Sequence, residues 1–320
     1  MDLHLGTRAR HLVAVLLAAA VAALGLGLAG PAQADSSTHH WKVWVGNESK
    51  NMAVQGMRFL PGQVWIDEGD TVTWAANAAE IHTVTFFKGG MKKATVPPFN
   101  PTDKMQVTRI GGKLYNPSQY YNSGLLTTGS SPLPGLSTFT SYTLKFNRDG
   151  NFTYYCVVHG KMMTGTVHVR PDGTAYPFTQ AQYNKQATTQ AAALVKDGQR
   201  LLSRTQKKSD AHHVFAGAQD NKVMVMRFLR GTVHIPVGSK VSFINDNMIV
   251  PHTVTFGPVP TGPSALAPSG DPTNYTGGAL SSGILEPGKT FTVTFKKAGT
   301  FPYICLLHDE MGMVGTVKVG

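Results

Sequence analysis

The chain has 320 residues, of which 15% are charged and 42% are hydrophobic, and it contains 34 glycines and 19 prolines. This length allows two domains of ordinary size, and the composition argues against long disordered or coiled-coil segments and favours a loop-rich β protein. The formal net charge is +11, but the basic residues are scattered and form no dense Lys/Arg block, so nucleic acid is not an expected partner.

The N-terminal residues have the pattern of an export signal. Arg8 and Arg10 form a basic start, an apolar run extends from Leu12 to Ala29, and the segment Ala32–Ala34 is a small-x-small cleavage site. A membrane anchor is the alternative, because the run reaches a length that could span a bilayer. The adjacent cleavage site favours removal of a signal peptide at residues 1–34. We therefore expect an exported protein, periplasmic or extracellular, with no stable membrane span after cleavage.

An internal repeat divides the rest of the chain. Residues 57–74 read as strand, turn and strand, and the same pattern returns about 170 residues later at 226–243. His82 and His252 then each begin a His-Thr-Val-Thr-Phe run, which predicts a strand with one buried face. After this run the first copy carries the longer insertion, roughly residues 87–135, which we interpret as loops or short irregular strands.

A repeat of this length indicates a duplicated domain, and the segment between the copies predicts a helical linker. We place the domains at residues 35–172 and 211–320 and the linker at 173–210. Thr179 to Gln182 can form a capping box, and Gly198 interrupts the helix at a cost of about 1 kcal/mol relative to alanine. The apolar residues near one helical face are Ala187, Ala191, Leu194, Leu201 and Leu202. We expect this face to pack on one of the two domains.

Each copy ends in a segment that concentrates soft metal ligands. Residues 154–167 read Tyr-Tyr-Cys-Val-Val-His-Gly-Lys-Met-Met-Thr-Gly-Thr-Val, and residues 303–317 read Tyr-Ile-Cys-Leu-Leu-His-Asp-Glu-Met-Gly-Met-Val-Gly-Thr-Val. The chain has two cysteines, Cys156 and Cys305, one in each segment. Two cysteines in an exported protein suggest a disulfide by default. Their equivalent places in two repeats, each with a histidine three residues on, favour metal binding instead.

Thiolate, imidazole and thioether ligands together suit copper, and two imidazoles and a thiolate in a plane with a weak axial thioether form a blue-copper electron-transfer site. The shared tail Met-x-Gly-Thr-Val selects one methionine in each copy, while Met162 and Met311 remain alternatives. The predicted ligands are His82, Cys156, His159 and Met163 in the first copy, and His252, Cys305, His308 and Met313 in the second.

The Tyr-Tyr-Cys-x-x-His…Met-x-Gly-x-Val ending and the Pro251-His252 pair resemble the cupredoxin family, specifically plastocyanin, pseudoazurin and amicyanin. The resemblance covers about residues 40–170 and 212–320. It implies an all-β fold of two tandem Greek-key β-sandwich domains joined by the helical linker, with one type 1 copper ion per domain and one-electron transfer. It also implies that the loop histidines, His159 and His308, reach the surface as electron ports.

Two departures from the family pattern leave all predicted ligands in place. Val158 and Leu307 stand between cysteine and histidine, where plastocyanin-like loops usually have proline. Ile81, not proline, precedes the first histidine. These changes would shift the reduction potential or the exposure of the centres.

The residues beside the cysteines argue against a copper enzyme. In multicopper oxidases and copper nitrite reductases, a histidine next to the copper-binding cysteine bridges to a catalytic copper. Here Cys156 is flanked by tyrosine and valine, Cys305 by isoleucine and leucine, and the chain contains no His-x-His pair. A copper storage or delivery module is the other alternative, although methionine-rich delivery sites normally lack the Cys-His-His set. We expect a non-enzymatic electron carrier whose partners are redox proteins with acidic surfaces.

Overall fold

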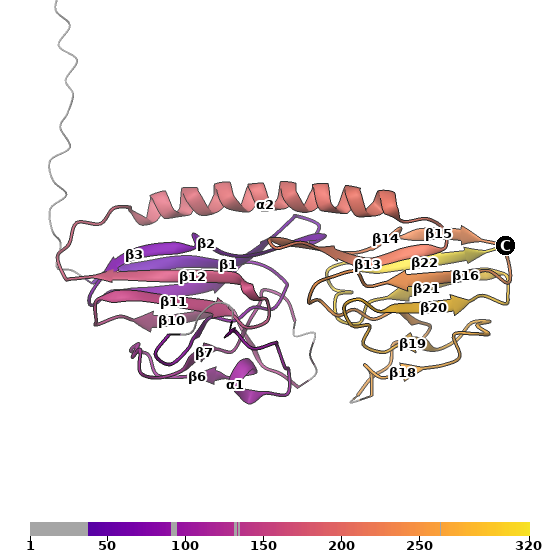
Figure 1. Ribbon diagram of the computed structural model, residues 1–320, viewed down its shortest axis with the longest axis horizontal. Coiled ribbons are helices and arrows are strands. Elements are labelled where there is room, and N and C mark those ends of the chain that lie inside the picture. Colours follow the sequence, from indigo (N-terminus) through magenta and orange to yellow (C-terminus); the bar gives the residue numbers. More distant parts are fainter. Residues whose placement is uncertain (1–37, 91–94, 131–132, 134, 263) are drawn as a thin grey trace, which may run out of the picture. The chain divides into compact units, whose positions relative to one another are not determined.

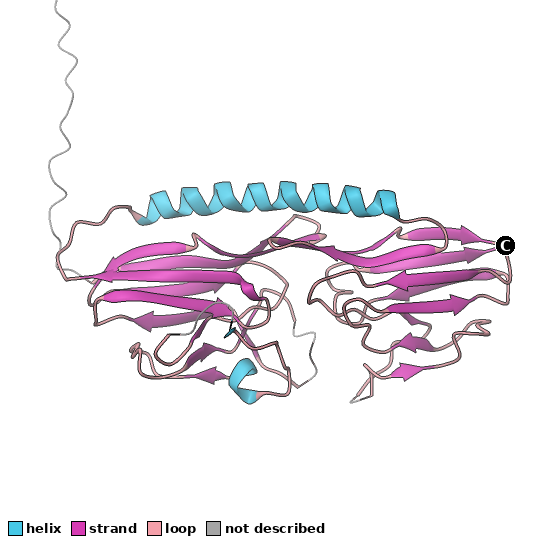
Figure 2. Ribbon diagram, viewed as in Figure 1, coloured by secondary structure: helices cyan, strands magenta, loops and turns pink. Residues whose placement is uncertain are grey.

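Strands are the predominant regular element in the part of the chain that the structure, a computed structural model, describes. The described residues are 38–320, apart from 91–94, 131–132, 134 and 263. The predicted signal peptide at 1–34 therefore lies outside the described residues. Within them, the α-helices are α1 (Lys104–Val107) and α2 (Gln180–Lys208), and all other regular elements are strands (Figure 2).

The first domain is a β-sandwich. Its strands are β1 (His40–Glu48), β2 (Val54–Leu60), β3 (Gln63–Asp67), β4 (Thr71–Ala76), β5 (Thr85–Phe86), β6 (Arg109–Ile110), β7 (Tyr121–Ser123), β8 (Leu125–Leu126), β9 (Thr138–Phe139), β10 (Ser141–Lys145), β11 (Gly150–Cys156) and β12 (Gly160–Arg170). One layer has the order β10-β4-β1-β2, and the other has the order β3-β12-β11-β5-β7-β6. The predicted insertion at 87–135 holds α1 and the short strands β6, β7 and β8, in line with the expected short irregular strands.

The second domain repeats this architecture. Its strands are β13 (His213–Gln219), β14 (Val223–Leu229), β15 (Thr232–Ile235), β16 (Lys240–Ile244), β17 (Thr255–Phe256), β18 (Pro268–Ser269), β19 (Leu280–Ser282), β20 (Thr290–Thr294), β21 (Gly299–Ile304) and β22 (Val314–Val319). One layer has the order β14-β13-β16-β20, and the other has the order β15-β22-β21-β17-β19-β18. The all-β fold of two tandem domains with a helical connection is therefore confirmed (Figure 1).

Equivalent aromatic side chains fill the space between the layers in both domains. The rings of each core include four that come from the same places in the two copies and lie edge-to-face or tilted against one another. These rings are Trp74, Phe86, Phe146 and Tyr154 in the first domain and Phe243, Phe256, Phe295 and Tyr303 in the second. The duplicated core fixes the same frame around each cysteine-containing loop.

The two domains share one sheet, which the sequence pattern did not predict. Strand β2 pairs antiparallel with β14, so that one eight-stranded sheet runs β10-β4-β1-β2-β14-β13-β16-β20 through both domains. Gln55 pairs with Met224, its own counterpart in the second copy. On either side of this pair, Gly56 pairs with Val223 and Val54 pairs with Val225. Val223 is the counterpart of Val54 in the second copy, and Val225 is the counterpart of Gly56. The junction is thus self-complementary, like the interface of a two-fold dimer.

The helix α2 covers this junction. Its capping box at Thr179 and Gln182 is present as predicted. The prediction that α2 packs on one domain is wrong, because it contacts β1 and β2 of the first domain and also β13 and β14 of the second (Figure 1). The buried cluster between α2 and the shared sheet contains Val54, Leu60, Ala187, Leu194, Leu201, Ala218, Val223, Val225 and Leu229. The boundaries at 35–172, 173–210 and 211–320 stay predictions.

Candidate metal centres

The first domain brings three of its predicted ligands to one buried point. Cys156 ends β11, His159 lies in the turn before β12, and His82 forms an isolated bridge with Leu126 ahead of β5. The two Nδ1 atoms of His82 and His159 are 3.1 Å apart. The sulfur of Cys156 lies 3.3 Å from Nδ1 of His159 and 3.9 Å from Nδ1 of His82.

The second domain repeats this arrangement with nearly the same distances. The Nδ1 atoms of His252 and His308 are 3.2 Å apart. The sulfur of Cys305 lies 3.3 Å from Nδ1 of His308 and 3.7 Å from Nδ1 of His252. Within the described part of the chain, these two clusters are the groups of three or more His, Cys, Asp or Glu residues whose ligand atoms lie close enough to hold one metal ion.

These distances fit three ligands around a common ion. Metal–nitrogen bonds of about 2.0 Å and a metal–sulfur bond of about 2.3 Å, spaced by 120° in a plane, place two nitrogens ~3.5 Å apart and nitrogen and sulfur ~3.7 Å apart. The separations in both domains lie within a few tenths of an ångström of these values. Both groups could therefore hold a copper ion.

The two cysteines are free thiols, so the alternative of a disulfide is excluded. Burial raises the pKa of each thiol, Cys156 and Cys305, to about 11. Burial also lowers the pKa of His159 to about 3 and that of His308 to about 4, which keeps both imidazoles neutral. Neutral imidazoles have a lone pair free for a metal, whereas each thiol must lose its proton when a metal binds.

Backbone amides hold the sulfur atoms in place. The N–H of Thr83 donates to the sulfur of Cys156 at 3.3 Å, and the N–H of Thr253 donates to that of Cys305 at 3.4 Å. Each threonine hydroxyl also accepts a hydrogen bond from the residue after the cysteine, Val157 or Leu306. Hydrogen bonds to a ligand sulfur stabilise negative charge on it and tune the potential of a bound metal.

The methionines differ in their surroundings. Met163 and Met313 are fully buried in the same cores as Cys156 and Cys305, respectively. In contrast, the backbone carbonyls of Met162 and Met311 each accept a hydrogen bond from an arginine, Arg58 and Arg227 respectively.

The glycine of the shared Met-x-Gly-Thr-Val tail is required by packing. A Cβ on Gly165 would lie 2.3 Å from the ring of Tyr154, and a Cβ on Gly315 would lie 2.3 Å from the ring of Tyr303.

Two glycines support the upstream histidines, and sequence reasoning missed both. A Cβ on Gly46 would lie 2.4 Å from Nε2 of His82, and a Cβ on Gly217 would lie 2.7 Å from Nε2 of His252. Both glycines have positive φ, 70° and 75° respectively. The signal was present in the sequence as a glycine in the first strand of each copy.

The loop histidines do not reach the surface in the described chain. His159 is 1% exposed and His308 is 5% exposed, so the expectation that they are surface ports is wrong. Their Nε2 atoms face the carboxylate of Glu80, at 3.8 Å from His159 and 3.9 Å from His308. Sequence reasoning did not single out Glu80, because its only pattern signal is its place two residues before His82.

Comparison with known proteins gives the family. A family model described as copper binding proteins, plastocyanin/azurin family, matches residues 212–320. Plastocyanin A'/A'' of Nicotiana tabacum is 32% identical over 96 residues, which cover 29% of this chain and 88% of that protein. This chain belongs to the plastocyanin/azurin family. The chloroplastic plastocyanin of Tetradesmus obliquus is 31% identical, with a match that covers 47% of this chain and 93% of that protein.

Among solved structures, the Cu(I) form of an amicyanin mutant is 24% identical in sequence to this chain, with a TM-score of 0.24. The match covers 35% of this chain and 84% of the amicyanin chain. Neither described helix has the length and apolarity to cross a lipid bilayer.

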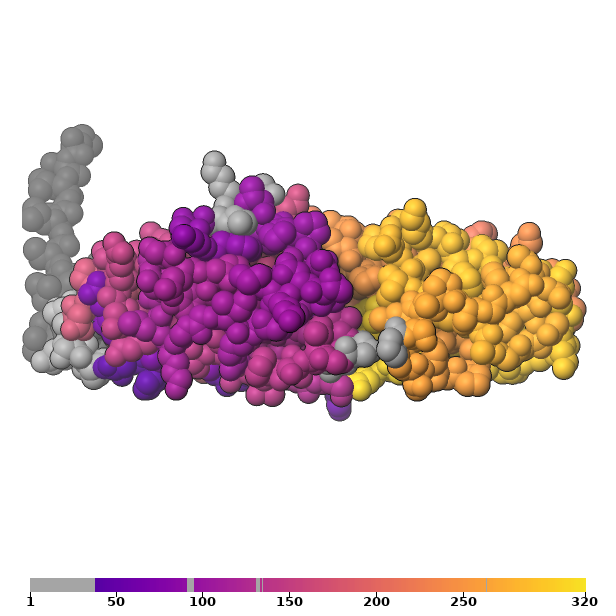
Figure 3. All heavy atoms as spheres, turned by 90° about the horizontal axis from the view of Figure 1, so that it is seen from below, coloured from indigo at the N-terminus to yellow at the C-terminus, as the bar shows by residue number. Residues whose placement is uncertain are grey.

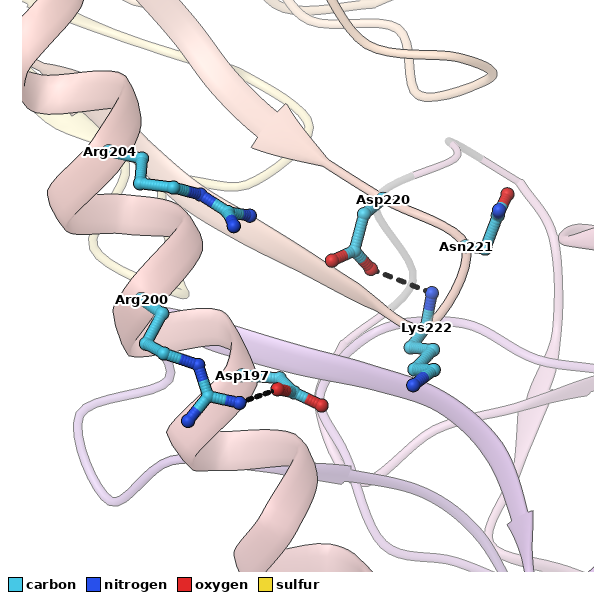
Figure 4. Close-up of a pocket in the computed structure, with 6 residues that line it drawn as sticks. All are labelled: Asp197, Arg200, Arg204, Asp220, Asn221 and Lys222. Carbon is cyan, nitrogen blue, oxygen red and sulfur yellow. Dashed lines mark hydrogen bonds and ion pairs between the residues drawn. The ribbon is translucent and has the colours of Figure 1, made fainter.

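A surface pocket of about 330 Å³ lies apart from both His-Cys-His groups (Figure 4). It lies between α2 and the turn that joins β13 to β14, and opposite charges line it. Its residues are Asp197, Arg200, Arg204, Asp220, Asn221 and Lys222. Asp197 and Arg200 form an ion pair within the helix, and none of these residues is a predicted ligand.

Proposed function

We propose that this protein is an exported carrier of single electrons with one type 1 copper centre in each domain. The main support is that, in each domain, two Nδ1 atoms and one sulfur meet at a buried point. In each domain the same core also contains a fully buried methionine. The proposed ligands are His82, Cys156, His159 and Met163 for the first centre, and His252, Cys305, His308 and Met313 for the second.

The chain's own residues prepare each centre for electron transfer. A bound copper ion supplies one-electron chemistry between Cu(I) and Cu(II). The β-sandwich holds the imidazoles and the thiol at fixed separations, so little rearrangement accompanies a change of charge. The amides of Thr83 and Thr253 support charge on the sulfurs, and burial of the four histidines at 5% exposure or less keeps water away.

The surroundings of the cysteines favour a carrier over an enzyme. Val157 and Tyr155 beside Cys156 are buried apolar residues, and Ile304 and Leu306 flank Cys305. In the described part of the chain, no third cluster of His, Cys, Asp or Glu meets the same closeness criterion. A catalytic copper next to a type 1 centre would need such a cluster, so we propose that electrons enter and leave through protein partners.

Export and partner choice are part of this proposal. The basic start, apolar run and cleavage site at residues 1–34 support export to a periplasmic or extracellular location. The net charge of +11 favours redox partners with acidic surfaces, because opposite charges speed encounter.

Copper titration of the mature protein tests the carrier proposal. We expect two equivalents of Cu(II) to bind and to give the intense blue charge-transfer band of a thiolate-bound copper. The protein should also exchange electrons with small redox reagents without consuming oxygen or nitrite. Binding of colourless Cu(I) alone would favour a storage or delivery module, and steady turnover of oxygen or nitrite without a partner would show an enzyme.

A further inference from the structure

A single buried carboxylate stands between the two metal clusters. Glu80 belongs to the first domain and is 5% exposed. Its Oε1 lies 3.8 Å from Nε2 of His159 in the same domain, and its Oε2 lies 3.9 Å from Nε2 of His308 in the other domain. The backbone amide of Ser130 in the first domain also donates a hydrogen bond to the carboxylate of Glu310 in the second. On the face opposite α2, the atoms of the two domains meet at this boundary (Figure 3).

The burial of Glu80 needs a compensating partner. A buried carboxylate is costly unless it is paired or hydrogen-bonded. Among the described residues, the two neutral imidazoles of His159 and His308 lie within 4 Å of its carboxylate oxygens, and no lysine or arginine lies that close. Burial raises the pKa of Glu80 to about 8, and the backbone amide of Ile81 acts against this shift. The second copy has Val250 at the equivalent place, two residues before its own histidine, and that valine is also buried. The carboxylate is therefore not required by the duplicated fold itself.

Metal ligation would fix the ring proton of both histidines on Nε2, where it can be donated in a hydrogen bond to such a partner. When a neutral imidazole binds a metal through Nδ1, its ring proton is on Nε2. The clusters place Nδ1 of His159 and His308 at the metal positions, so each Nε2–H would lie next to Glu80, with nitrogen–oxygen distances of 3.8 and 3.9 Å. A movement of less than about 1 Å would turn each contact into a hydrogen bond of ordinary length.

We propose that Glu80 is a positioning residue shared by both copper centres, accepting one hydrogen bond from His159 and one from His308; this inference rests on the proposed function. A carboxylate on the far nitrogen of a ligand histidine fixes the ring and makes it a stronger donor. One side chain thus orients a ligand in each domain and links the two centres by a chain of hydrogen bonds.

With copper in both centres, this chain of contacts would also be a route for electrons inside the molecule. His159, Glu80 and His308 would carry one electron from a Cu(I) centre to a Cu(II) centre, with no proton transferred. The family pattern predicted that the rings of His159 and His308 are exposed at the surface, but both are buried and lie next to Glu80.

The variants Glu80→Val and Glu80→Gln test the shared role. Valine is the residue of the second copy at this place, and glutamine keeps the shape if valine disturbs folding. Loaded with Zn(II), which is diamagnetic, the wild-type full chain should show slowly exchanging Nε2–H signals from both His159 and His308 by ¹⁵N NMR. In Glu80→Val both should exchange at least ~10-fold faster, and the metal affinity of both centres should fall ~10–100-fold. In Glu80→Gln, whose side-chain amide has one accepting oxygen, at least one signal should weaken.

The deciding measurement is whether Glu80→Val changes the centres of both domains. In copper-loaded Glu80→Val, the reduction potentials of both centres should rise, because a negative acceptor that favours Cu(II) is gone. Glu310→Gln, an exposed acidic residue at the same boundary, is the matched control and should leave both histidine signals unchanged. A change confined to His159, no change at all, or a third metal equivalent that Glu80→Val abolishes would overturn the inference. None of these outcomes bears on whether the wild type is blue, so the proposed function is tested separately.

Discussion

Gly198 of α2 packs directly on Val54 of β2. A Cβ on Gly198 would lie 2.2 Å from Cγ1 of Val54, which no real side chain tolerates. Val54 is 1% exposed and pairs with Val225 of β14, so it sits where the shared sheet passes from one domain to the other. The glycine that weakens the helix locally lets α2 approach this junction closely.

The first prediction follows from that contact. Gly198→Ala gains about 1 kcal/mol of helix propensity, but an added methyl in a packed site costs ~1–3 kcal/mol. Because Val54 is β-branched and buried on a strand, it has little freedom to move aside. The cost therefore falls in the upper half of that range, at ~2–3 kcal/mol, and we expect the free energy of unfolding in urea to fall by about 1–2 kcal/mol. The neighbouring exposed substitution Gln199→Ala should stay within ~0.5 kcal/mol of wild type. Unchanged or increased stability of Gly198→Ala would contradict this account of the junction.

A second prediction concerns the glycine beneath the first upstream histidine. Gly46→Ala places a methyl against Nε2 of His82 and should lower the copper affinity of the first centre by at least ~10-fold, with the second centre unaffected. Gly69→Ala is the control, because Gly69 also has positive φ but a Cβ there would meet nothing within 4 Å. Both variants should lose ~1–2 kcal/mol of stability from backbone strain. Competition with a copper chelator distinguishes them, and equal affinities in the two variants would refute a steric role for Gly46.

A third prediction separates the two methionines of the first loop. Met163→Leu removes a thioether donor, which destabilises Cu(II) more than Cu(I), so the reduction potential of the first centre should rise. The swap nearly conserves volume and should cost less than ~1.5 kcal/mol of stability. Met162→Leu should leave the potential unchanged, because the sulfur of Met162 lies 4.0 Å from Nε2 of Gln219 in the other domain. Voltammetry in a Cys305→Ser background isolates the first centre. A shift in Met162→Leu alone would reverse the assignment.

Local patterns were enough to predict the duplicated fold and the residues that form the two clusters. The Cys-x-x-His loop keeps its ligands close in sequence, and the repeat of His-Thr-Val-Thr-Phe marked the histidine supplied by a neighbouring strand. Burial of Met163 and Met313 agrees with the choice made from the shared tail, and their role as ligands stays a prediction.

The relation between the domains was beyond those patterns. The pairing of Gln55 with Met224 joins β2 to β14, and neither strand carries a sequence pattern that predicts a partner in the other repeat. That joining brings His308 beside Glu80, far away in sequence, and buries the histidines that the family pattern predicted as exposed. A contact between repeats leaves no periodic signal, so sequence reasoning had no means of finding it.

The visible absorption and copper content of wild type, Cys156→Ser and Cys305→Ser test the central claim most directly. The account predicts two coppers and an intense blue band in the wild type. Each single variant should retain one copper and about half of the absorbance, because each domain contributes one cysteine. A colourless copper-loaded wild type would contradict the type 1 assignment. A variant that keeps the full blue intensity would show that the domain carrying that substitution holds no blue copper.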